Sequence, residues 1–332
     1  MLLLPLAALA AAGAPSAEFI YETASFPSCH ASTLVETGPG ELMAAWFGGT
    51  REGAKDVAIW GAHRRAGKWS QPVELVREPN TPTWNPVLFR DGKGTFWLYY
   101  KFGPSPREWS AGRMSSVDRG LTWSKPEHLP AGILGPVKNK PLVLKDGTIV
   151  SGTSVESYHA WTSWVERSTD HGRSWSKHGP VVYPGETFAS IQPAIVALKG
   201  GSTLRMYVRT TEKLGRIGYS DSADGGRTWT DLRLLQLPNP NSGIDAVSLA
   251  DGRIALVYNH TTEGRSPLNV AISSDGLAFQ QLATLESEPG EFSYPAIVQS
   301  SAGSLHITYT WNRKKVKHAE ISAASLRKGE QR

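Results

Sequence analysis

The sequence predicts an all-β fold, a β-propeller with six blades. The main indication is an eight-residue motif that occurs at residues 116–123 (SVDRGLTW), 168–175 (STDHGRSW) and 222–229 (SADGGRTW). A shorter copy at 273–279 (SSDGLAF) ends in Phe instead of Trp, and residues 64–69 (RRAGKW) keep only the end of the motif. The aromatic positions 69, 123, 175, 229 and 279 are therefore separated by 54, 52, 54 and 50 residues. A repeat of this length, with several strands in each unit, is typical of a propeller.

Each copy of the motif is expected to fold a hairpin turn. Its Asp and Ser side chains can bond nearby backbone amides, and its Gly supplies a positive φ. We expect the Trp to pack back under the turn, between adjacent blades. The composition agrees, because 33 Gly and 22 Pro among 332 residues suit many short strands joined by turns. A ring of blades can also remain one domain at this length.

Taken in order, the chain contains six blade openings. Residues 18–23 form a strand that is expected to complete the last blade. Residues 26–35 and 42–47 are the first strands of blade one, and a glycine-rich loop at 48–56 precedes the next strand. The other openings begin near positions 84, 139, 192, 243 and 293, and a Gly-containing turn follows each of them.

Polar residues at these openings are the first candidate site. The first strand of a blade lies nearest the propeller axis, so the polar residue before it is expected to face the central funnel. Side chains that converge on one axis from six repeats predict a binding site, although any one of them could instead cap its strand. The residues expected at this equivalent place are His30, Asn85, Asn139 with Lys140, Gln192, Asp245 and Tyr294.

Charge and cysteine content exclude several functions. The net charge of +5 is mild and the only short basic run is at 313–315, so nucleic acid is not an expected partner. The single cysteine, Cys29, leaves no internal disulfide and no Cys-based zinc site. We see no metal-ligand spacing and no phosphate-binding loop, so neither a metal nor another cofactor is predicted.

The first 17 residues are apolar and rich in alanine, which is typical of a secretory signal peptide. This stretch is shorter than the roughly 20 residues that a membrane span needs, so stable membrane insertion is not expected. The sequence thus predicts a signal peptide at 1–17 and a single domain at 18–332. We expect the mature protein to be a secreted or periplasmic monomer.

The repeated motif resembles the Asp-box, or BNR repeat, of the sialidase (neuraminidase) superfamily, and the resemblance runs from about Glu18 to the C-terminus. It implies a sialidase-like six-bladed propeller that acts on glycans with acidic sugars. In that family three arginines hold a carboxylate, a tyrosine activated by a glutamate is the nucleophile, and an aspartate is the acid and base. The tyrosine suits a reacting carbon whose own carboxylate would repel an anionic nucleophile.

Several of these roles match residues of this chain. Tyr294, in the sequence FSYP that opens the last blade, resembles the family's nucleophile. Arg209 and Arg265 resemble the second and third arginines, and Asp56 is the best match to the acid and base. With them, Gln192, Asn85, Lys140, Asp245 and Arg51 are expected to bind the substrate.

Two family positions differ. His30 stands where the first arginine is expected, and Gln192 stands in place of the glutamate. Imidazole does not reproduce the planar fork of arginine, and an amide is not a base for a phenol. The leading interpretation is an exo-acting hydrolase that releases sialic acid or a related sugar.

Three alternatives stay open. A polysaccharide lyase could use His30 and Tyr294 for β-elimination from a uronate. Asp56 or Glu52 could act with Glu156 or Asp245 in another kind of hydrolase. A non-catalytic glycan-binding propeller would also account for the 12 tryptophans.

Overall fold

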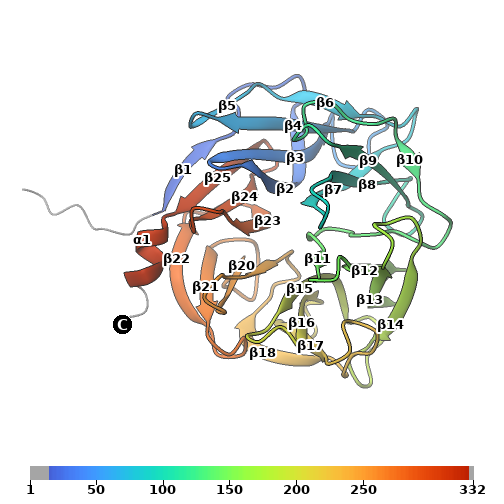
Figure 1. Ribbon diagram of the computed structural model, residues 1–332, viewed down its shortest axis with the longest axis vertical. Helices are drawn as coiled ribbons and strands as arrows, with labels where there is room; N and C mark the ends of the chain where they lie inside the picture. Colours follow the sequence, from blue (N-terminus) through green and yellow to red (C-terminus); the bar gives the residue numbers. More distant parts are fainter. Residues whose placement is uncertain (1–14, 329–332) are drawn as a thin grey trace, which may run out of the picture.

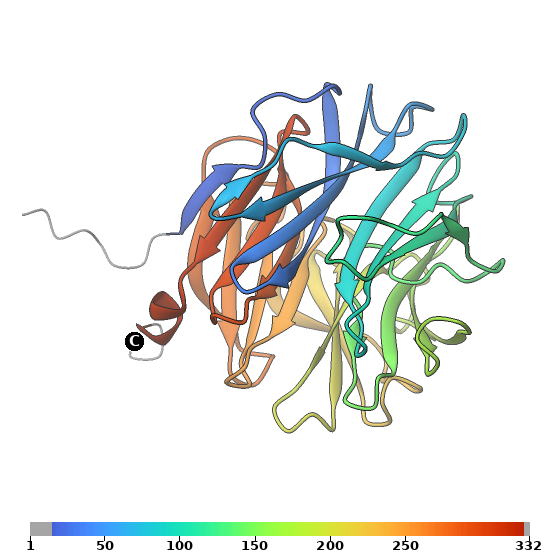
Figure 2. The same ribbon diagram turned by 45° about the horizontal axis from the view of Figure 1, so that its top comes forward.

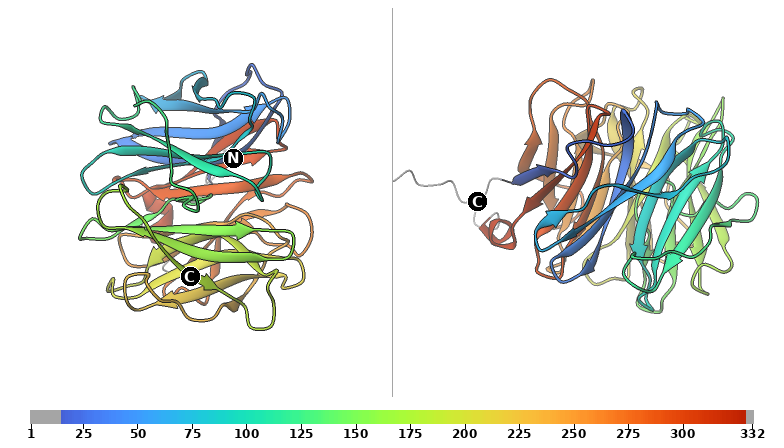
Figure 3. Two further views of the ribbon diagram at one scale, coloured as in Figure 1. Left: turned by 90° about the vertical axis from the view of Figure 1, so that its right-hand side faces the viewer. Right: turned by 90° about the horizontal axis from the view of Figure 1, so that it is seen from above.

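Six antiparallel sheets surround a central axis in the computed structural model, which describes residues 15–328 (Figure 1). Each sheet is one blade, and the first strand of each blade lies innermost in the ring. Rotated views show the blades standing side by side around the axis, with loops projecting from both faces (Figures 2 and 3). The prediction of an all-β, six-bladed propeller is confirmed.

The strands of the first three blades follow the predicted order along the chain. Blade one contains β2 (Ser28–Gly38), β3 (Glu41–Gly49) and β4 (Ala58–Arg65), with β5 (Lys68–Trp69) and β6 (Val73–Val76) both paired to β4. Blade two contains β7 (Thr83–Arg90), β8 (Phe96–Phe102), β9 (Ser110–Ser116) and β10 (Glu127–His128). Blade three contains β11 (Leu142–Val143), β12 (Ile149–Glu156), β13 (Trp161–Ser168) and β14 (Ser176–Val181).

The other three blades repeat this arrangement. Blade four contains β15 (Ser190–Ala197), β16 (Leu204–Thr210), β17 (Arg216–Ser222) and β18 (Arg233–Pro238). Blade five contains β19 (Asp245–Ser248), β20 (Ile254–Asn259), β21 (Leu268–Ser273) and β22 (Gln280–Glu286). Blade six contains β23 (Phe292–Gln299), β24 (Leu305–Trp311) and β25 (Lys315–Ile321), and β1 (Ser16–Phe19) is its outer strand.

The ring closes as expected, because the N-terminal strand β1 pairs antiparallel with β25. This strand covers Ser16–Phe19 and not residues 18–23, so the propeller begins two residues before the predicted domain start. Ser16 and Ala17 pair with Glu320 and Ala319, although the sequence placed them at the end of the signal peptide. Residues 1–14 of the predicted signal peptide lie outside the described part of the chain.

Buried histidines lie at the closing seam, by which we mean the place where the N-terminal strand β1 joins the last blade. The Oε1 atom of Glu18 on β1 accepts hydrogen bonds from Arg64 Nε at 3.0 Å and from Trp69 Nε1 at 3.2 Å. The Nδ1 atom of His318 lies 3.2 Å from the same oxygen, and its Nε2 lies 3.1 Å from Nδ1 of His306. Polar contacts therefore connect the first and last strands of the chain at the point where the propeller is joined.

The repeated motif folds the turn that its residue types predict. In the first copy Asp118 accepts hydrogen bonds from Ser116 Oγ at 2.7 Å, Thr122 N at 2.9 Å and Thr122 Oγ1 at 2.6 Å. Gly120 adopts φ of 81°, and its carbonyl accepts a bond from Trp123 Nε1 at 3.1 Å. The copies at 168–175 and 222–229 repeat these bonds. Because these bonds are all made within the motif, its residue types and their spacing specify the turn.

The aromatic anchor of each motif packs against the preceding blade, as predicted. Trp123 joins Met43 and Leu88 in a cluster between blades one and two. Phe279, which replaces Trp in the fourth copy, lies edge-on to Tyr207 of blade four with ring centroids 5.8 Å apart. The hydrophobic core is thus a series of layers between blades, and the polar axis is left to the innermost strands.

A short helix, α1 (Ala323–Lys328), follows β25 and lies outside the ring (Figure 1). Within residues 15–328, no helix has the length and apolar character needed to cross a membrane.

Candidate functional site

Four blades begin with the same backbone irregularity at the axis. The pairing between the first two strands shifts between residues 30 and 33, 84 and 87, 191 and 194, and 293 and 296. The second residue of each shifted segment has a positive φ, namely 55° at Ala31, 30° at Asn85, 58° at Gln192 and 51° at Tyr294. Non-glycine residues in this region are strained, and such bulges often direct a side chain into a functional site.

The register confirms the predicted equivalence of Asn85, Gln192 and Tyr294 but corrects that of His30. Ala31 holds the equivalent place in blade one, one residue beyond the prediction. The sequence suggested His30 because a polar residue was expected there, whereas the backbone register decides the position. His30 nevertheless reaches the axis from the neighbouring position, and its ring centroid lies 4.2 Å from that of Tyr294.

Three of the predicted axial side chains bond to the next blade. Asn85 Nδ2 donates to Val137 O at 3.0 Å, and Asn139 Nδ2 donates to Gln192 O at 2.9 Å. Asp245 Oδ2 accepts from the backbone amide of Ile297 at 2.9 Å and from Lys140 Nζ at 2.8 Å. We call Asn85, Asn139 and Asp245 the axial clasps, because each connects the beginning of one blade to that of another. Their expected contact with substrate stays a prediction, as does that of Lys140.

Tyr294 is the centre of the polar cluster that remains. Its hydroxyl oxygen accepts hydrogen bonds from Arg209 Nη1 at 3.0 Å and from Gln192 Nε2 at 3.1 Å. Arg209 extends from the end of β16, and Asn241 Oδ1 holds its Nε at 2.7 Å. The structure thus brings together three residues from blades four and six that the sequence assigned to the site. Two donors aimed at one phenolic oxygen are suited to negative charge developing on that atom.

His30 packs behind the Tyr294 ring as an uncharged group. It is 2% exposed, and neither of its ring nitrogens has a hydrogen-bond partner in the part of the chain that the structure describes. Burial holds the pKa of His30 well below its usual value, and the charges of Arg313, Arg265, Arg209 and Lys138 act in the same direction. A neutral imidazole is therefore expected at neutral pH.

A second arginine, Arg265, borders Tyr294, and it shares a carboxylate with Arg313. The Arg265 guanidinium carbon lies 5.9 Å from the centroid of the Tyr294 ring, and Arg265 Nη1 lies 3.6 Å from Glu291 Oε1. Arg313 Nε donates to the same Glu291 oxygen at 2.8 Å, and Arg313 Nη1 also pairs with Glu52. Arg265 Nη1 is buried and has no hydrogen-bond partner within residues 15–328, so a donor remains for a ligand.

A buried lysine forms the floor beneath this cluster. Lys138 Nζ donates to Asn139 Oδ1 at 2.9 Å, to Ile244 O at 2.7 Å and to the carbonyl of Pro295. It also lies 5.9 Å from the centroid of the Tyr294 ring. Burial lowers the pKa of Lys138 to about 7, although Asp245 acts in the opposite direction. The environment of Tyr294 is thus cationic on several sides.

The loop predicted to hold the acid and base is exposed. Asp56 Oδ2 accepts from Thr50 N at 2.9 Å and from Thr50 Oγ1 at 2.6 Å. These bonds lower the pKa of Asp56, which favours its ionised form. Arg51 is exposed on the same loop. Glu52 connects this loop to the arginines through Arg313, so the loop borders the cluster even though Asp56 itself is bonded to Thr50.

Sequence reasoning missed Arg313, Glu291 and Lys138. Arg313 was noted only as part of a short basic run, and no local pattern distinguishes it from a surface charge. Lys138 directly precedes Asn139 and Lys140, so its position beside a predicted blade opening was an available signal. Among the described residues, no group of His, Cys, Asp and Glu is arranged to hold a metal ion.

Taken together, the cluster can bind an anion beside a polarised phenol. Arg209 and Arg265 lie beside the Tyr294 ring, and Arg313 shares the Glu291 carboxylate with Arg265, so guanidinium groups from three different blades meet here. Guanidinium groups bind carboxylates through paired hydrogen bonds, and a partly buried site strengthens that attraction. The Tyr294 hydroxyl could attack, donate or accept a proton next to the bound anion.

Comparison with known proteins matches the chain to one repeat family and to solved structures with the same fold. The family model described as "BNR repeat-like domain" matches residues 40–307. A protein of unknown function from Dyadobacter fermentans is 16% identical with a TM-score of 0.78, and the match covers 92% of this chain and 97% of that one. A search of curated proteins finds no match.

Solved sialidase structures also share the fold. The intramolecular trans-sialidase from Ruminococcus gnavus, solved with oseltamivir carboxylate, is 15% identical with a TM-score of 0.75, covering 93% of this chain and 98% of that one. A Hadza microbial sialidase is 18% identical with a TM-score of 0.74, covering 90% of this chain and 66% of that one. At these identities the likeness establishes the fold alone.

Proposed function

Because the chain belongs to the BNR repeat-like domain family, we propose that it is an exo-acting glycosidase that removes a terminal acidic sugar from glycans. Sialic acid or a related sugar is the proposed substrate class. The observation that carries this proposal is the convergence of Arg209 and Arg265 on Tyr294, with Arg313 joined to Arg265 through Glu291. The similarity to sialidase folds supports a glycan-directed role at a coarser level.

The arginines would hold the sugar carboxylate, and Arg313 would take the part of the arginine that is absent at position 30. Arg265 Nη1 has a free donor within the described chain, and Arg313 reaches the cluster from the β24–β25 turn. Glu52 and Glu291 now compensate these charges, so a bound carboxylate would compete with the Glu52 contact. This supports an anionic ligand more strongly than an uncharged sugar.

The proposed reaction begins when the Tyr294 hydroxyl gives its proton to solvent and the resulting phenolate oxygen attacks the anomeric carbon. A bond forms between that oxygen and the sugar while the glycosidic bond breaks, and the leaving oxygen takes a proton from the acid. Arg209 and Gln192 would stabilise the negative charge of the attacking oxygen through their donated hydrogen bonds. Water then cleaves the sugar–tyrosine bond. Asp56 is the proposed acid and base, and substrate binding would have to release its bonds to Thr50.

A uronate lyase is the second candidate, and the position of His30 favours it. A neutral imidazole 4.2 Å from the Tyr294 ring centroid could assist proton transfer, and the arginines would neutralise the uronate carboxylate. In that reaction a base removes the proton beside the carboxylate, the glycosidic bond breaks with the leaving oxygen taking up a proton, and a carbon–carbon double bond forms in the product. The ultraviolet absorbance of this product distinguishes the two reactions.

The test is turnover of a panel of acidic glycosides by the purified protein, with free sugar and ultraviolet absorbance followed together. Tyr294→Phe is the test variant, and Tyr219→Phe is the control because Tyr219 stacks on Arg205 in blade four. We expect sugar release without absorbance, and a loss of at least about 100-fold in Tyr294→Phe alone, as for removal of a nucleophile. Rising absorbance would favour the lyase, and no turnover of any acidic glycoside would refute both candidates.

Wild type and the Tyr294→Phe variant also test the third possibility, a propeller that binds glycans without catalysis. Glycan binding that persists in Tyr294→Phe, with no turnover in wild type, would support that role instead.

A further inference from the structure

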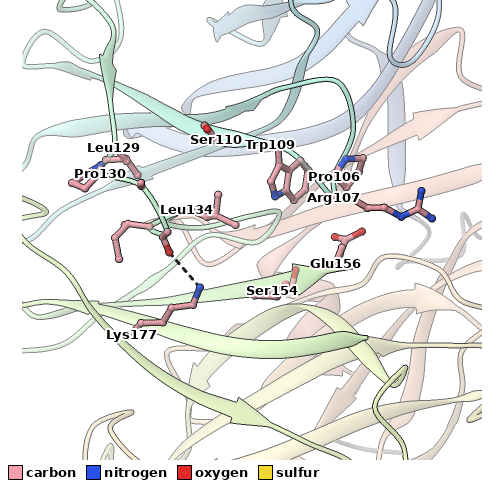
Figure 4. Close-up of a pocket in the computed structure, with 14 residues that line it drawn as sticks. Pro106, Arg107, Trp109, Ser110, Leu129, Pro130, Leu134, Ser154, Glu156 and Lys177 are labelled. Carbon is pink, nitrogen blue, oxygen red and sulfur yellow. Dashed lines mark hydrogen bonds between the residues drawn. The ribbon is translucent and has the colours of Figure 1, made fainter. Parts of the chain in front are cut away.

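A cleft between blades two and three lies outside the polar cluster of Tyr294 (Figure 4). Four chain segments form it: the β8–β9 loop, the segment between β10 and β11, the end of β12 and the start of β14. Its volume is about 190 Å³, which is below the roughly 300–1,000 Å³ of sites that enclose a drug-sized ligand. The cleft therefore suits one small unit, such as a single sugar ring.

One wall of the cleft is apolar and the opposite wall is polar. Trp109, with Leu129 and Pro130, supplies the apolar surface, while Ser154 and Glu156 lie across from Trp109 (Figure 4). Pyranose rings combine an apolar face of C–H groups with hydroxyls at their edges. An aromatic ring can pack on such a face while polar groups bind the hydroxyls.

Two polar atoms of the cleft lack partners. Ser154 Oγ and Glu156 Oε1 are both buried, and neither has a hydrogen-bond partner within the part of the chain that the structure describes. A buried polar atom without a partner is costly and needs a physical explanation. Burial also raises the pKa of Glu156 to about 7, which the charges of Arg209 and Arg107 partly offset. The carboxyl group can therefore donate or accept a hydrogen bond near neutral pH.

The cleft is connected to the central site through one aromatic side chain. Glu156 is paired across the strands with Trp161, whose ring lies 5.7 Å from the Arg209 guanidinium carbon. Arg209 in turn bonds the Tyr294 hydroxyl. Trp161 also stacks on the partly exposed Phe188, with centroids 4.7 Å apart. A glycan held at Tyr294 could thus extend along this aromatic surface into the cleft.

The charges of the cleft differ from those of the central site. Arg107 and Lys177 are opposed by Glu156 and by Glu166, whose Oε1 lies 4.0 Å from Lys177 Nζ. This balance gives no reason for a second anionic group to bind here, in contrast to the arginine cluster around Tyr294. An uncharged, hydroxylated ring fits the mixed apolar and polar walls better.

We propose that this cleft is a subsite for an uncharged sugar unit next to the terminal acidic sugar, with Trp109 packing on the ring and Glu156 and Ser154 binding its hydroxyls. The inference rests on the proposed function, because it assigns the part of the glycan that remains after the acidic sugar is released. The proposed substrates are therefore oligosaccharides with a neutral sugar next to the acidic one, and not isolated acidic monosaccharide derivatives.

The test compares two substrates with the same acidic sugar, one with a neutral disaccharide as leaving group and one with a small aryl group. We expect Trp109→Ala and Glu156→Gln each to lower kcat/KM about tenfold for the oligosaccharide. Both variants should remain within about twofold of wild type for the aryl glycoside, which does not reach the cleft. Glu127→Gln is the control for the carboxyl change, because Glu127 is 62% exposed and pairs with Arg113 on the outer strands of blade two.

A binding measurement separates failure of the subsite from failure of the proposed function. Lactose, used as a neutral probe, should bind wild type with a millimolar Kd by NMR titration, and Trp109→Ala should weaken that binding at least about tenfold. Lactose binding lost in Trp109→Ala would support the subsite even if no acidic glycoside is turned over. Equal effects of the variants on both substrates, or unchanged lactose binding in Trp109→Ala, would overturn it.

Discussion

The axial clasp at Asn85 should make a measurable contribution to the stability of the propeller. Asn85 is 5% exposed, donates Nδ2 to Val137 O at 3.0 Å across two blades, and has φ of 30°. Substitution by alanine removes the donor and leaves the carbonyl of Val137 without it. The same substitution also places a residue with a Cβ and no compensating polar group in the left-handed region.

The expected size of the effect follows from these two losses. An unsatisfied buried acceptor costs about 1–3 kcal/mol. The left-handed backbone adds about 1–2 kcal/mol for a residue such as alanine. Asn85→Ala should therefore lower the free energy of unfolding by roughly 2–5 kcal/mol. With an unfolding entropy of about 2.1 cal/mol/K per residue, this corresponds to a fall in Tm of roughly 3–7 °C for a chain of this length.

Asn80 provides a matched control for the backbone contribution. It is exposed and has φ of 53°, so Asn80→Ala should cost only the left-handed component, about 1–2 kcal/mol. Denaturant and thermal unfolding followed by tryptophan fluorescence would measure both variants. The difference between them gives the contribution of the hydrogen bond between the blades. Equal losses in Asn85→Ala and Asn80→Ala would refute the clasp.

Three further predictions concern the closing seam, the thiol and the arginine cluster. Burial lowers the pKa of His306 and His318 in the folded protein. Below about pH 6.5 the unfolded chain therefore binds more protons than the folded protein does. Stability should therefore decrease from pH 7 to pH 5, and His318→Asn should reduce this dependence; an unchanged slope would contradict the assignment. Cys29 is 1% exposed and burial raises its pKa to about 12, so a thiol reagent should label it only after unfolding, and rapid labelling of the native protein would be evidence against its burial. Glu52→Gln removes one anion that pairs with Arg313, so KM for an acidic glycoside should fall several-fold with little change in kcat, whereas a higher KM would mean that Glu52 itself contacts the substrate.

Much of the fold could be predicted because its determining interactions are local. The Asp118 carboxylate, the Ser116 hydroxyl and the Trp123 ring of the first motif bond within eight consecutive residues, so their types and spacing specify the turn. The spacing of the motif copies then indicates a propeller, and the six blade openings along the chain give the number of blades. Tyr294, Arg209 and Gln192 could be assigned to one place because each lies at a recognisable point in its own repeat, and the structure places them in contact.

What the sequence alone determined is therefore the blade count, the motif turns and the repeat positions that approach the axis. Tertiary structure decided which side chains meet there. A shift of one residue at a bulge puts Ala31 where His30 was expected, and such a shift has no local signature. Arg313 and Glu52 are 261 positions apart and become neighbours only because the last blade closes on the first. Contacts made by ring closure depend on the position of every intervening blade, and no single repeat encodes them.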